Sequence, residues 1–290
     1  MRRYAAPVLR TRRRRTVLSL ALAIAAFVPT LVAAQQKPID PRDTTHAQHQ
    51  APFFTRKDAF LAAGFALGTV AMFPLDRHFA STLQDSGTQA NRFFKHAATG
   101  AELIASPGAY IIGGTLYVVG RVAHADRVAD LGWHGTEAVL VAEGFTWVIK
   151  GTAGRARPFL SNDTDPTDWR ATKGFTSGDW SSFPSGHTST AFAAAAAVTN
   201  ETTRWWPKSE WIVGPVMYAG ATAVGLSRMY HNKHWASDVV LGAAIGTFSG
   251  RKVVQYAHGH PHNFVDRWIL RTSAVPDGHG GVLVVYSVDP

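Results

Sequence analysis

The chain has 290 residues, no cysteine and a formal net charge of +9. The absence of cysteine excludes thiolate nucleophiles and thiolate metal sites. Residues 1–34 contain seven arginines and no acidic residue. Subtracting these seven charges from the net charge of +9 leaves +2 on the rest of the chain. No basic stripe interleaved with aromatic residues remains, and a nucleic-acid partner is not expected.

Residues 1–34 have the features of a secretory signal peptide. Arginines precede an apolar run over residues 17–32, and two alanines follow just before Gln35. We predict cleavage after Ala34 and a periplasmic or secreted mature protein. An uncleaved membrane anchor is the alternative. Residues 35–57 are polar and contain proline, which predicts a linker.

Six apolar segments dominate residues 58–256 and are typical of helices. Glycine, alanine and β-branched residues are frequent in them, the connections are short, and alternating strand patterns are nearly absent. The pattern predicts an all-α fold, a helical bundle of about six core helices. The predicted helices cover residues 59–73, 108–122, 135–149, 188–198, 211–226 and 239–254.

The apolar runs are short for membrane spans. Most reach roughly 15 residues, or about 22 Å of helix, whereas a bilayer core of about 30 Å needs about 20 residues. We therefore expect a periplasmic domain that can touch a membrane surface. A membrane-embedded bundle packed through glycine and alanine is the alternative.

The sequence does not assign a single role to two further segments. The loop at residues 159–183 is rich in aspartate and aromatic residues, and is either a substrate-selecting rim or an exposed connector. Residues 257–290 form a C-terminal tail, in which residues 280–288 are typical of a strand after a turn. The alternating histidines of residues 258–262 could bind a transition metal. No carboxylate or cysteine accompanies them at ligand spacing, so no metal site is predicted.

Two stretches offer groups that bind anions. The stretch from Lys150 to Pro158 adds two fixed cations, Arg155 and Arg157, with glycines that let backbone approach an anion. The stretch at residues 184–187 brings a hydroxyl, backbone N–H groups and the His187 imidazole to a predicted helix N-terminus, which favours anion binding.

A third stretch, residues 227–238, combines a cation, an imidazole and a carboxylate. Asp238 is placed where a helix N-cap would lie, four residues after His234. The carboxylate can therefore accept a hydrogen bond from one imidazole nitrogen while the other faces outward. Such an imidazole is a usable nucleophile, and Arg228 suits a forked contact with oxyanion oxygens.

These three stretches together resemble the type 2 phosphatidic acid phosphatase and haloperoxidase superfamily. Its signature blocks are Lys-x6-Arg-Pro, Pro-Ser-Gly-His and Ser-Arg-x5-His-x3-Asp, in that order. All of their residues and spacings are present between Lys150 and Asp238.

The resemblance implies a role for each block residue. His234 attacks phosphorus, Asp238 orients it, and His187 protonates the leaving group. The phosphate oxygens are held by Lys150, Arg157, Ser185, Gly186 and Arg228. No metal and no other cofactor is required, because three cations already match the phosphoryl charge.

The implied function is hydrolysis of phosphate monoesters through a phosphohistidine intermediate. The substrate is a phosphate ester, and phosphatidic acid and other lipid phosphates or diphosphates are included. A vanadium-dependent haloperoxidase, in which vanadate binds His234 in the same pocket, is one alternative. The other is a non-catalytic periplasmic phosphate-binding or structural protein, which would not need His187, His234 and Asp238 together.

Overall fold

The computed structural model of the chain describes residues 52–260, 263–270, 272–276 and 282–286. The predicted signal peptide and residues 35–51 of the predicted linker lie outside these residues. The α-helices are α2 (Arg56–Met72), α3 (Asp76–Leu83), α4 (Ser86–Ala90), α5 (Arg92–Leu103), α6 (Ala109–Val122), α7 (Asp126–Ala153), α8 (Gly186–Trp205), α9 (Glu210–Tyr230), α10 (Ala236–Gly259) and α11 (Phe264–Leu270). The shorter helical turns are η2 (Phe73–Leu75), η3 (Ile104–Gly108), η4 (Pro158–Ser161), η5 (Lys173–Phe175), η6 (Gly178–Trp180) and η7 (Pro207–Ser209). The strands are β1 (Thr272–Pro276) and β2 (Val282–Tyr286).

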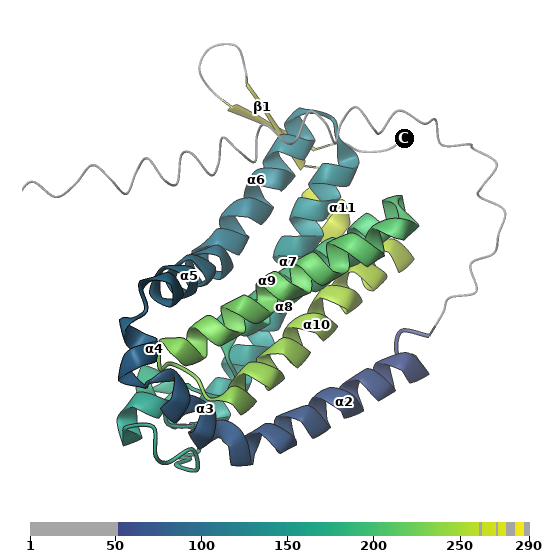
Figure 1. Ribbon diagram of the computed structural model, residues 1–290. Coiled ribbons are helices and arrows are strands. Elements are labelled where there is room, and N and C mark those ends of the chain that lie inside the picture. Colours follow the sequence, from purple (N-terminus) through teal and green to yellow (C-terminus); the bar gives the residue numbers. More distant parts are fainter. Residues whose placement is uncertain (1–51, 261–262, 271, 277–281, 287–290) are drawn as a thin grey trace, which may run out of the picture. The chain divides into compact units, whose positions relative to one another are not determined.

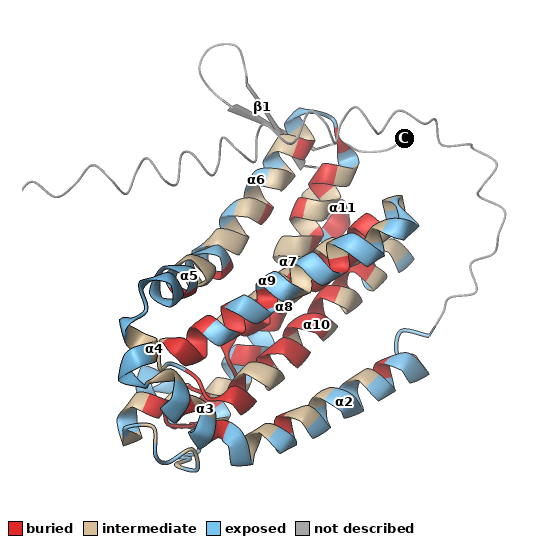
Figure 2. Ribbon diagram, viewed as in Figure 1, coloured by how far each residue is buried: buried red, intermediate tan, exposed pale blue. Residues whose placement is uncertain are grey.

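The predicted all-α helical fold is confirmed. Helix α8 packs against α7, α9 and α10, while α6 lies along α7 and α2 lies along α10 (Figure 1). Buried residues are frequent along α8 and α10, whereas α2 is mostly exposed (Figure 2). The long helices α7 to α10 therefore form the centre of the bundle.

Small residues bring α8 and α10 close together. A Cβ atom at Gly246 would lie 2.2 Å from the Ser189 carbonyl oxygen, and one at Gly250 would lie 2.4 Å from that of Ala193. Alanines and valines of α7, α8 and α10 fill the adjoining core. Close backbone approach fixes the axial register of α8 and α10, whose N-terminal ends carry predicted site residues.

Each predicted helical segment lies mainly within an observed helix, and apart from α6 the observed helices are longer than predicted. Helix α7 has 28 residues and α10 has 24. Helix α7 continues through polar positions because their side chains find partners inside the fold. Thr190 donates to Glu143 at 2.5 Å, and Lys150 Nζ donates to the Ser181 carbonyl at 2.6 Å. Helices α3, α4, α5 and α11 were not predicted.

Two predicted boundaries are wrong by a few residues. The linker was predicted to reach residue 57, yet α2 begins at Arg56, because Thr55 and Asp58 form a capping box. The tail was predicted to begin at residue 257, but α10 continues to Gly259. The predicted strand near the C-terminus is confirmed, since β2 pairs antiparallel with β1.

Within the residues that the structure describes, two helical stretches are long and apolar enough to cross a membrane, judged by length and composition. They are Arg56–Leu83 and Arg92–Val122, and only 11% and 17% of their most apolar windows are buried. The expectation that the apolar segments are too short to span a bilayer is therefore wrong for these two. The turn η2 joins α2 to α3, whereas η3 connects α5 to α6 through a kink, where Ser106 leaves helical backbone angles with φ −149° and ψ 122°.

Candidate active site

Four helix ends bring the three blocks together. Lys150 lies in the last turn of α7, His187 in the first turn of α8, Arg228 in the last turn of α9, and Asp238 in the first turn of α10. Hydrogen bonds join the blocks directly. Ser185 N donates to the Asp238 carbonyl at 2.9 Å, and Arg157 Nη1 donates to the Lys233 carbonyl at 3.3 Å. The predicted convergence of the blocks is present in the structure.

His234 is held with one imidazole nitrogen engaged. Its Nδ1 lies 2.7 Å from the Ser182 carbonyl and 3.5 Å from Asp238 Oδ2. A carbonyl only accepts, so Nδ1 carries the proton and Nε2 carries the lone pair. Within the described part of the chain, Nε2 has no hydrogen-bond partner. The expected contact with Asp238 exists, but the Ser182 carbonyl is the nearer partner.

Asp238 is not the N-cap that its spacing predicted. Trp235 is the N-cap of α10 and Asp238 is three residues further, where its Oδ2 accepts from Trp235 N at 2.9 Å and from Ser182 Oγ at 2.5 Å. Burial alone would raise its pKa, but the Arg155 guanidinium and the other donors lower the pKa of Asp238 to about 2. The carboxylate is therefore ionised beside His234 at neutral pH.

Arg155 supports this carboxylate and was missed in that role by sequence reasoning. It is fully buried, and its Nη1 and Nη2 contact Asp238 at 2.5 Å and Asp76 at 2.7 Å. Its guanidinium carbon also lies 4.8 Å from the centre of the Trp169 ring. Arg155 is thus an internal ion-pair residue and not the anion-binding cation that its block suggested.

Gly154 makes the turn between Lys150 and Arg155. It follows α7 with φ 58°, in the left-handed region, and its N–H donates to the Lys150 carbonyl at 3.2 Å. A Cβ atom there would lie 1.8 Å from the Arg170 carbonyl oxygen. Glycine is required because both the backbone angle and the space exclude a side chain.

Three cations line the site beside His234. Lys150 Nζ is anchored on the Ser181 carbonyl, and Arg157 Nε donates to the Gly178 carbonyl at 2.8 Å. Arg228 is 5% exposed, and among the described residues its Nε has no hydrogen-bond partner. Burial, followed by the charge of Arg157, lowers the pKa of Lys150 to about 7. A bound anion would relieve this crowding of positive charge.

Glu102 of α5 completes the rim of the site and was not singled out from the sequence. Its carboxylate forms an ion pair with Arg228, lies 2.9 Å from His231 Nδ1, and lies 4.0 Å from His187 Nε2. A single glutamate in an apolar helix gives no motif, so only the fold connects it to the blocks. His231, which lies in the third block but is not one of its signature residues, belongs to this ion-pair cluster.

In the second block, the backbone N–H of Ser185 is not available for a phosphate, contrary to expectation. The Ser185 N–H is occupied by the Asp238 carbonyl, and Ser185 Oγ accepts from Thr188 at 2.8 Å. The hydroxyl is therefore the donor that Ser185 can offer. Gly186 begins α8, where first-turn N–H groups lack intrahelical partners. Burial, followed by the charge of Arg228, lowers the pKa of His187 to about 4.

The loop at residues 159–183 supports the site and is more than an exposed connector. Its carbonyls at Gly178 and Ser181 anchor Arg157 and Lys150, and its Ser182 carbonyl anchors His234. Whether its aromatic residues also select the substrate stays a prediction.

Comparison with known proteins agrees with this geometry. Residues 132–260, which contain all three blocks, match the model of the PAP2 superfamily. This segment is a PAP2 superfamily domain. It begins within α7 and ends just after α10. The PAP2 domain therefore includes the four helix ends that carry the predicted site residues.

Two proteins are similar to this chain. A lipid A 1-phosphatase of Porphyromonas gingivalis is 45% identical over 71 residues, which are 24% of this chain and 15% of the relative. This chain thus matches only a small part of the length of that relative. A solved structure of a transmembrane PAP2-type phosphatidylglycerolphosphate phosphatase from Bacillus subtilis is 19% identical and has a TM-score of 0.31. That match covers 66% of this chain and 96% of the solved one, and at this TM-score it adds nothing to the assignment.

Proposed function

We propose that this protein is a membrane-associated phosphatase that hydrolyses the phosphate monoester of a lipid through a phosphohistidine intermediate. The observation that carries the proposal is the environment of His234. Its Nδ1–H is bound to the Ser182 carbonyl, while no described residue hydrogen-bonds Nε2, which leaves that lone pair available. Burial, followed by the charge of Lys150, keeps the pKa of His234 well below its usual range, so the imidazole is neutral.

Phosphoryl transfer follows from this arrangement. Nε2 of His234 attacks phosphorus, and the bond from phosphorus to the ester oxygen breaks. Lys150, Arg157 and Arg228 stabilise the charge that spreads over the phosphoryl oxygens. Asp238, ionised and fixed by Arg155, stabilises the imidazolium that forms on His234. A metal ion is not needed for this step, because three cations already surround the phosphoryl position.

His187 handles the proton of the leaving group. In the free protein its pKa is about 4, so it is neutral at pH 7. A dianionic phosphate bound beside it raises this pKa, which lets His187 take up a proton and donate it to the leaving alkoxide. Water then attacks phosphorus while His187 takes up its proton, the phosphorus–nitrogen bond breaks, and phosphate and neutral His234 are released.

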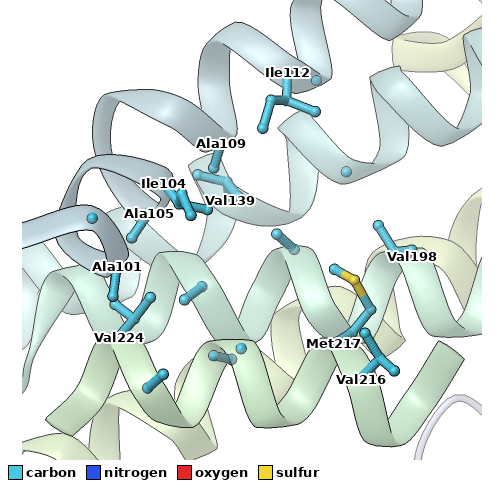
Figure 3. A pocket seen from close by; sticks show the side chains of 18 of the residues that line it. Ala101, Ile104, Ala105, Ala109, Ile112, Val139, Val198, Val216, Met217 and Val224 are labelled. Carbon is cyan, nitrogen blue, oxygen red and sulfur yellow. The ribbon is translucent and has the colours of Figure 1, made fainter. Parts of the chain in front are cut away.

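An apolar cavity beside the site supports a lipid substrate. It has a volume of about 530 Å³ and lies among α5, α6, α7, α8 and α9 (Figure 3). Ala101 in its wall precedes Glu102, and Val224 lies one turn before Arg228. An acyl chain can therefore lie in the cavity while the phosphate reaches the cations. The similarity to a lipid A 1-phosphatase agrees with this substrate class.

The test is His234→Ala in the full chain, assayed with phosphatidic acid in mixed micelles and with p-nitrophenyl phosphate. We expect turnover of both substrates to fall by roughly 1,000-fold or more, because removal of a covalent nucleophile costs at least this much. The dissociation constant for vanadate, measured by thermal shift, should stay within about tenfold of the wild-type value, since the cations remain. His260→Ala, an exposed histidine outside the site, is the matched control.

Turnover within tenfold of the wild-type rate would contradict the nucleophile assignment. Activity on p-nitrophenyl phosphate with none on phosphatidic acid would contradict the lipid substrate. Bromide oxidation by peroxide in the presence of vanadate, with no phosphatase activity, would instead identify a haloperoxidase.

A further inference from the structure

A second cluster of ligand-type side chains lies at the opposite end of the central helices. His134 of α7, Glu201 of α8 and His258 of α10 offer nitrogen or oxygen atoms that all lie within 4.8 Å of one another. On α8, Glu201 follows His187 by 14 residues, which is about 21 Å of helix. The cluster is therefore separate from the phosphate-binding end of the bundle.

Glu201 connects the two imidazoles. Its Oε1 lies 2.5 Å from His134 Nδ1, and both of its oxygens lie within 3.0 Å of His258 Nε2. Glu201 is fully buried and His134 is 2% exposed, while His258 is half-buried at the edge of the bundle. The accessible side of His258 gives an ion a route from solvent.

A second carboxylate is positioned behind His134. Asp266 Oδ2 lies 3.6 Å from His134 Nε2, an atom that is buried and has no hydrogen-bond partner in the described residues. Asp266 is itself fixed, because Trp133 Nε1 donates to its Oδ1 at 3.0 Å and Asn263 Nδ2 donates to its Oδ2 at 2.6 Å. A carboxylate behind a ligand histidine is the usual arrangement around protein-bound zinc, because it orients the ring and raises its basicity.

The charge around the cluster also favours a cation. Asp130 and Glu137, both half-buried on α7, act electrostatically on His134. With Glu201 and Asp266, four carboxylates therefore surround two imidazoles. Buried carboxylates in such excess are stabilised by a metal ion or by protons.

We propose that His134 Nδ1, His258 Nε2 and the Glu201 carboxylate bind one zinc ion, with Asp266 accepting a hydrogen bond from His134 Nε2. Two imidazoles and one carboxylate are a ligand set that zinc uses. Tetrahedral bonds of about 2.0–2.2 Å separate ligand atoms by roughly 3.3 Å, so the atoms now at 2.5–3.0 Å need to part by less than about 1 Å. Water can fill the fourth position.

The ion would join three helices that come from distant parts of the sequence. Zinc replaces the protons that lie between Glu201 and each imidazole, so binding releases protons and depends on pH. Because the ligands exist as a set only in the folded chain, zinc binding would stabilise the fold. This inference does not depend on the proposed phosphatase activity.

The experiment uses the full chain purified through an affinity tag without histidine, treated with a chelator and dialysed. Zinc chloride is then titrated by calorimetry, and zinc retained after gel filtration is measured by mass spectrometry. We expect one zinc per chain and a higher thermal unfolding temperature. His258→Ala and Glu201→Gln should each weaken zinc binding by roughly 10- to 100-fold or more.

Two controls assign the effect to this cluster. His260→Ala removes an exposed imidazole two residues away that stacks on Tyr256 at 4.4 Å, and should bind zinc like the wild type. His187→Ala removes an imidazole of the phosphate site and should also retain zinc. Circular dichroism confirms that each variant is folded, and the half-buried position of His258 favours a folded variant.

The proposal is overturned if the folded wild-type chain retains no zinc, or if His258→Ala and Glu201→Gln bind zinc as the wild type does. Loss of zinc from His187→Ala alone would place the ion at the phosphate site and also contradict it. Each of these results would leave the cluster as a network of hydrogen bonds and ion pairs without a metal ion.

Discussion

The Lys150 side chain contributes positive charge to the site, and this charge depends on pH. It lies with Arg157 and Arg228 around one position, and burial together with the charge of Arg157 lowers its pKa to about 7. Arginine has a much higher intrinsic pKa than lysine. The positive charge of the site therefore depends on pH mainly through Lys150.

This dependence gives a prediction for anion binding. Sulfate remains a dianion between pH 6 and 9, and in the free protein His187, with a pKa of about 4, is neutral throughout this range. Any proton that His187 gains when sulfate binds is common to the wild type and to a variant at Lys150. Below pH 7 Lys150 is charged and sulfate binds without a protonation cost. Above pH 7 the lysine must first take up a proton, so we expect the dissociation constant to rise by roughly tenfold per pH unit.

Calorimetric titration of sulfate at pH 6.5, 7.5 and 8.5 measures this change. Lys150→Arg is the matched variant, because arginine stays charged and should flatten the profile. A wild-type dissociation constant that changes by less than twofold over this range would show that Lys150 does not titrate in the site.

At the scale of elements, Arg155 joins parts of the chain that the sequence separates. Its guanidinium links Asp76 at the start of α3 to Asp238 in α10, and Ser237 accepts from it at 2.7 Å. The rings of Phe73 and Trp169 lie 5.1 and 4.8 Å from its carbon. The position of Asp238 beside His234 therefore depends on a residue that does not touch the phosphoryl group.

We expect Arg155→Lys to destabilise the fold although the charge is kept. One ammonium cannot reach both carboxylates, and an unpaired buried carboxylate costs roughly 3–5 kcal/mol. For a domain of this size the thermal unfolding temperature should fall by roughly 10 °C. Differential scanning fluorimetry measures the shift.

Arg170→Lys is the control for this prediction. Arg170 is also placed over a tryptophan, Trp180, at 4.1 Å, but it is largely exposed and its only ion pair is a surface contact with Asp168 among the described residues. Exposed contacts of this kind contribute about 1 kcal/mol or less. Equal, small shifts for both variants would show that Arg155 is not the central link described above.

The sequence predicted the residues of the site better than the residues that hold them in position, and the reason is physical. Lys150, His187, Arg228, His234 and Asp238 lie in blocks with fixed spacing, so their types and order identify them. Glu102 and Asp76 are single carboxylates in helices, and their partners lie over 75 residues away. The cluster of His134, Glu201 and His258 likewise needs helix register, which the local repeat at residues 258–262 does not contain.

The lengths of the elements were underestimated for the same reason. Glu143 interrupts the predicted helix 135–149 and Lys150 ends it, but helix α7 continues because these side chains are paired inside the fold. Short connecting turns also join α2 to α3 and α5 to α6, so that two stretches reach 28 and 31 residues. Hydropathy runs alone do not contain this information.

At the scale of the whole molecule, charged and polar partners gather at the helix ends, while apolar side chains remain exposed on several helices. Phe60, Leu67 and Val70 of α2, and Trp211 and Ile212 of α9, are among the exposed apolar residues. Exposed apolar surface on this scale is typical of contact with a membrane or a partner. Together with the two long apolar stretches it favours membrane association over the soluble periplasmic domain that run lengths suggested.

The final prediction concerns this association. We expect the mature chain, identified by its N-terminal sequence, to remain in the membrane pellet after a carbonate wash and to be released by detergent. Leu67 and Val70 lie near the middle of Arg56–Leu83 and are 71% and 64% exposed. Arginine at both positions should release a larger fraction of the chain, because a charge at the centre of a span costs about 2.5–3.5 kcal/mol. Ser81→Arg, an exposed site near the end of the same stretch, is the control and should stay in the pellet. Wild-type protein in the carbonate supernatant would contradict membrane insertion and, with it, the lipid-facing role assigned to α2.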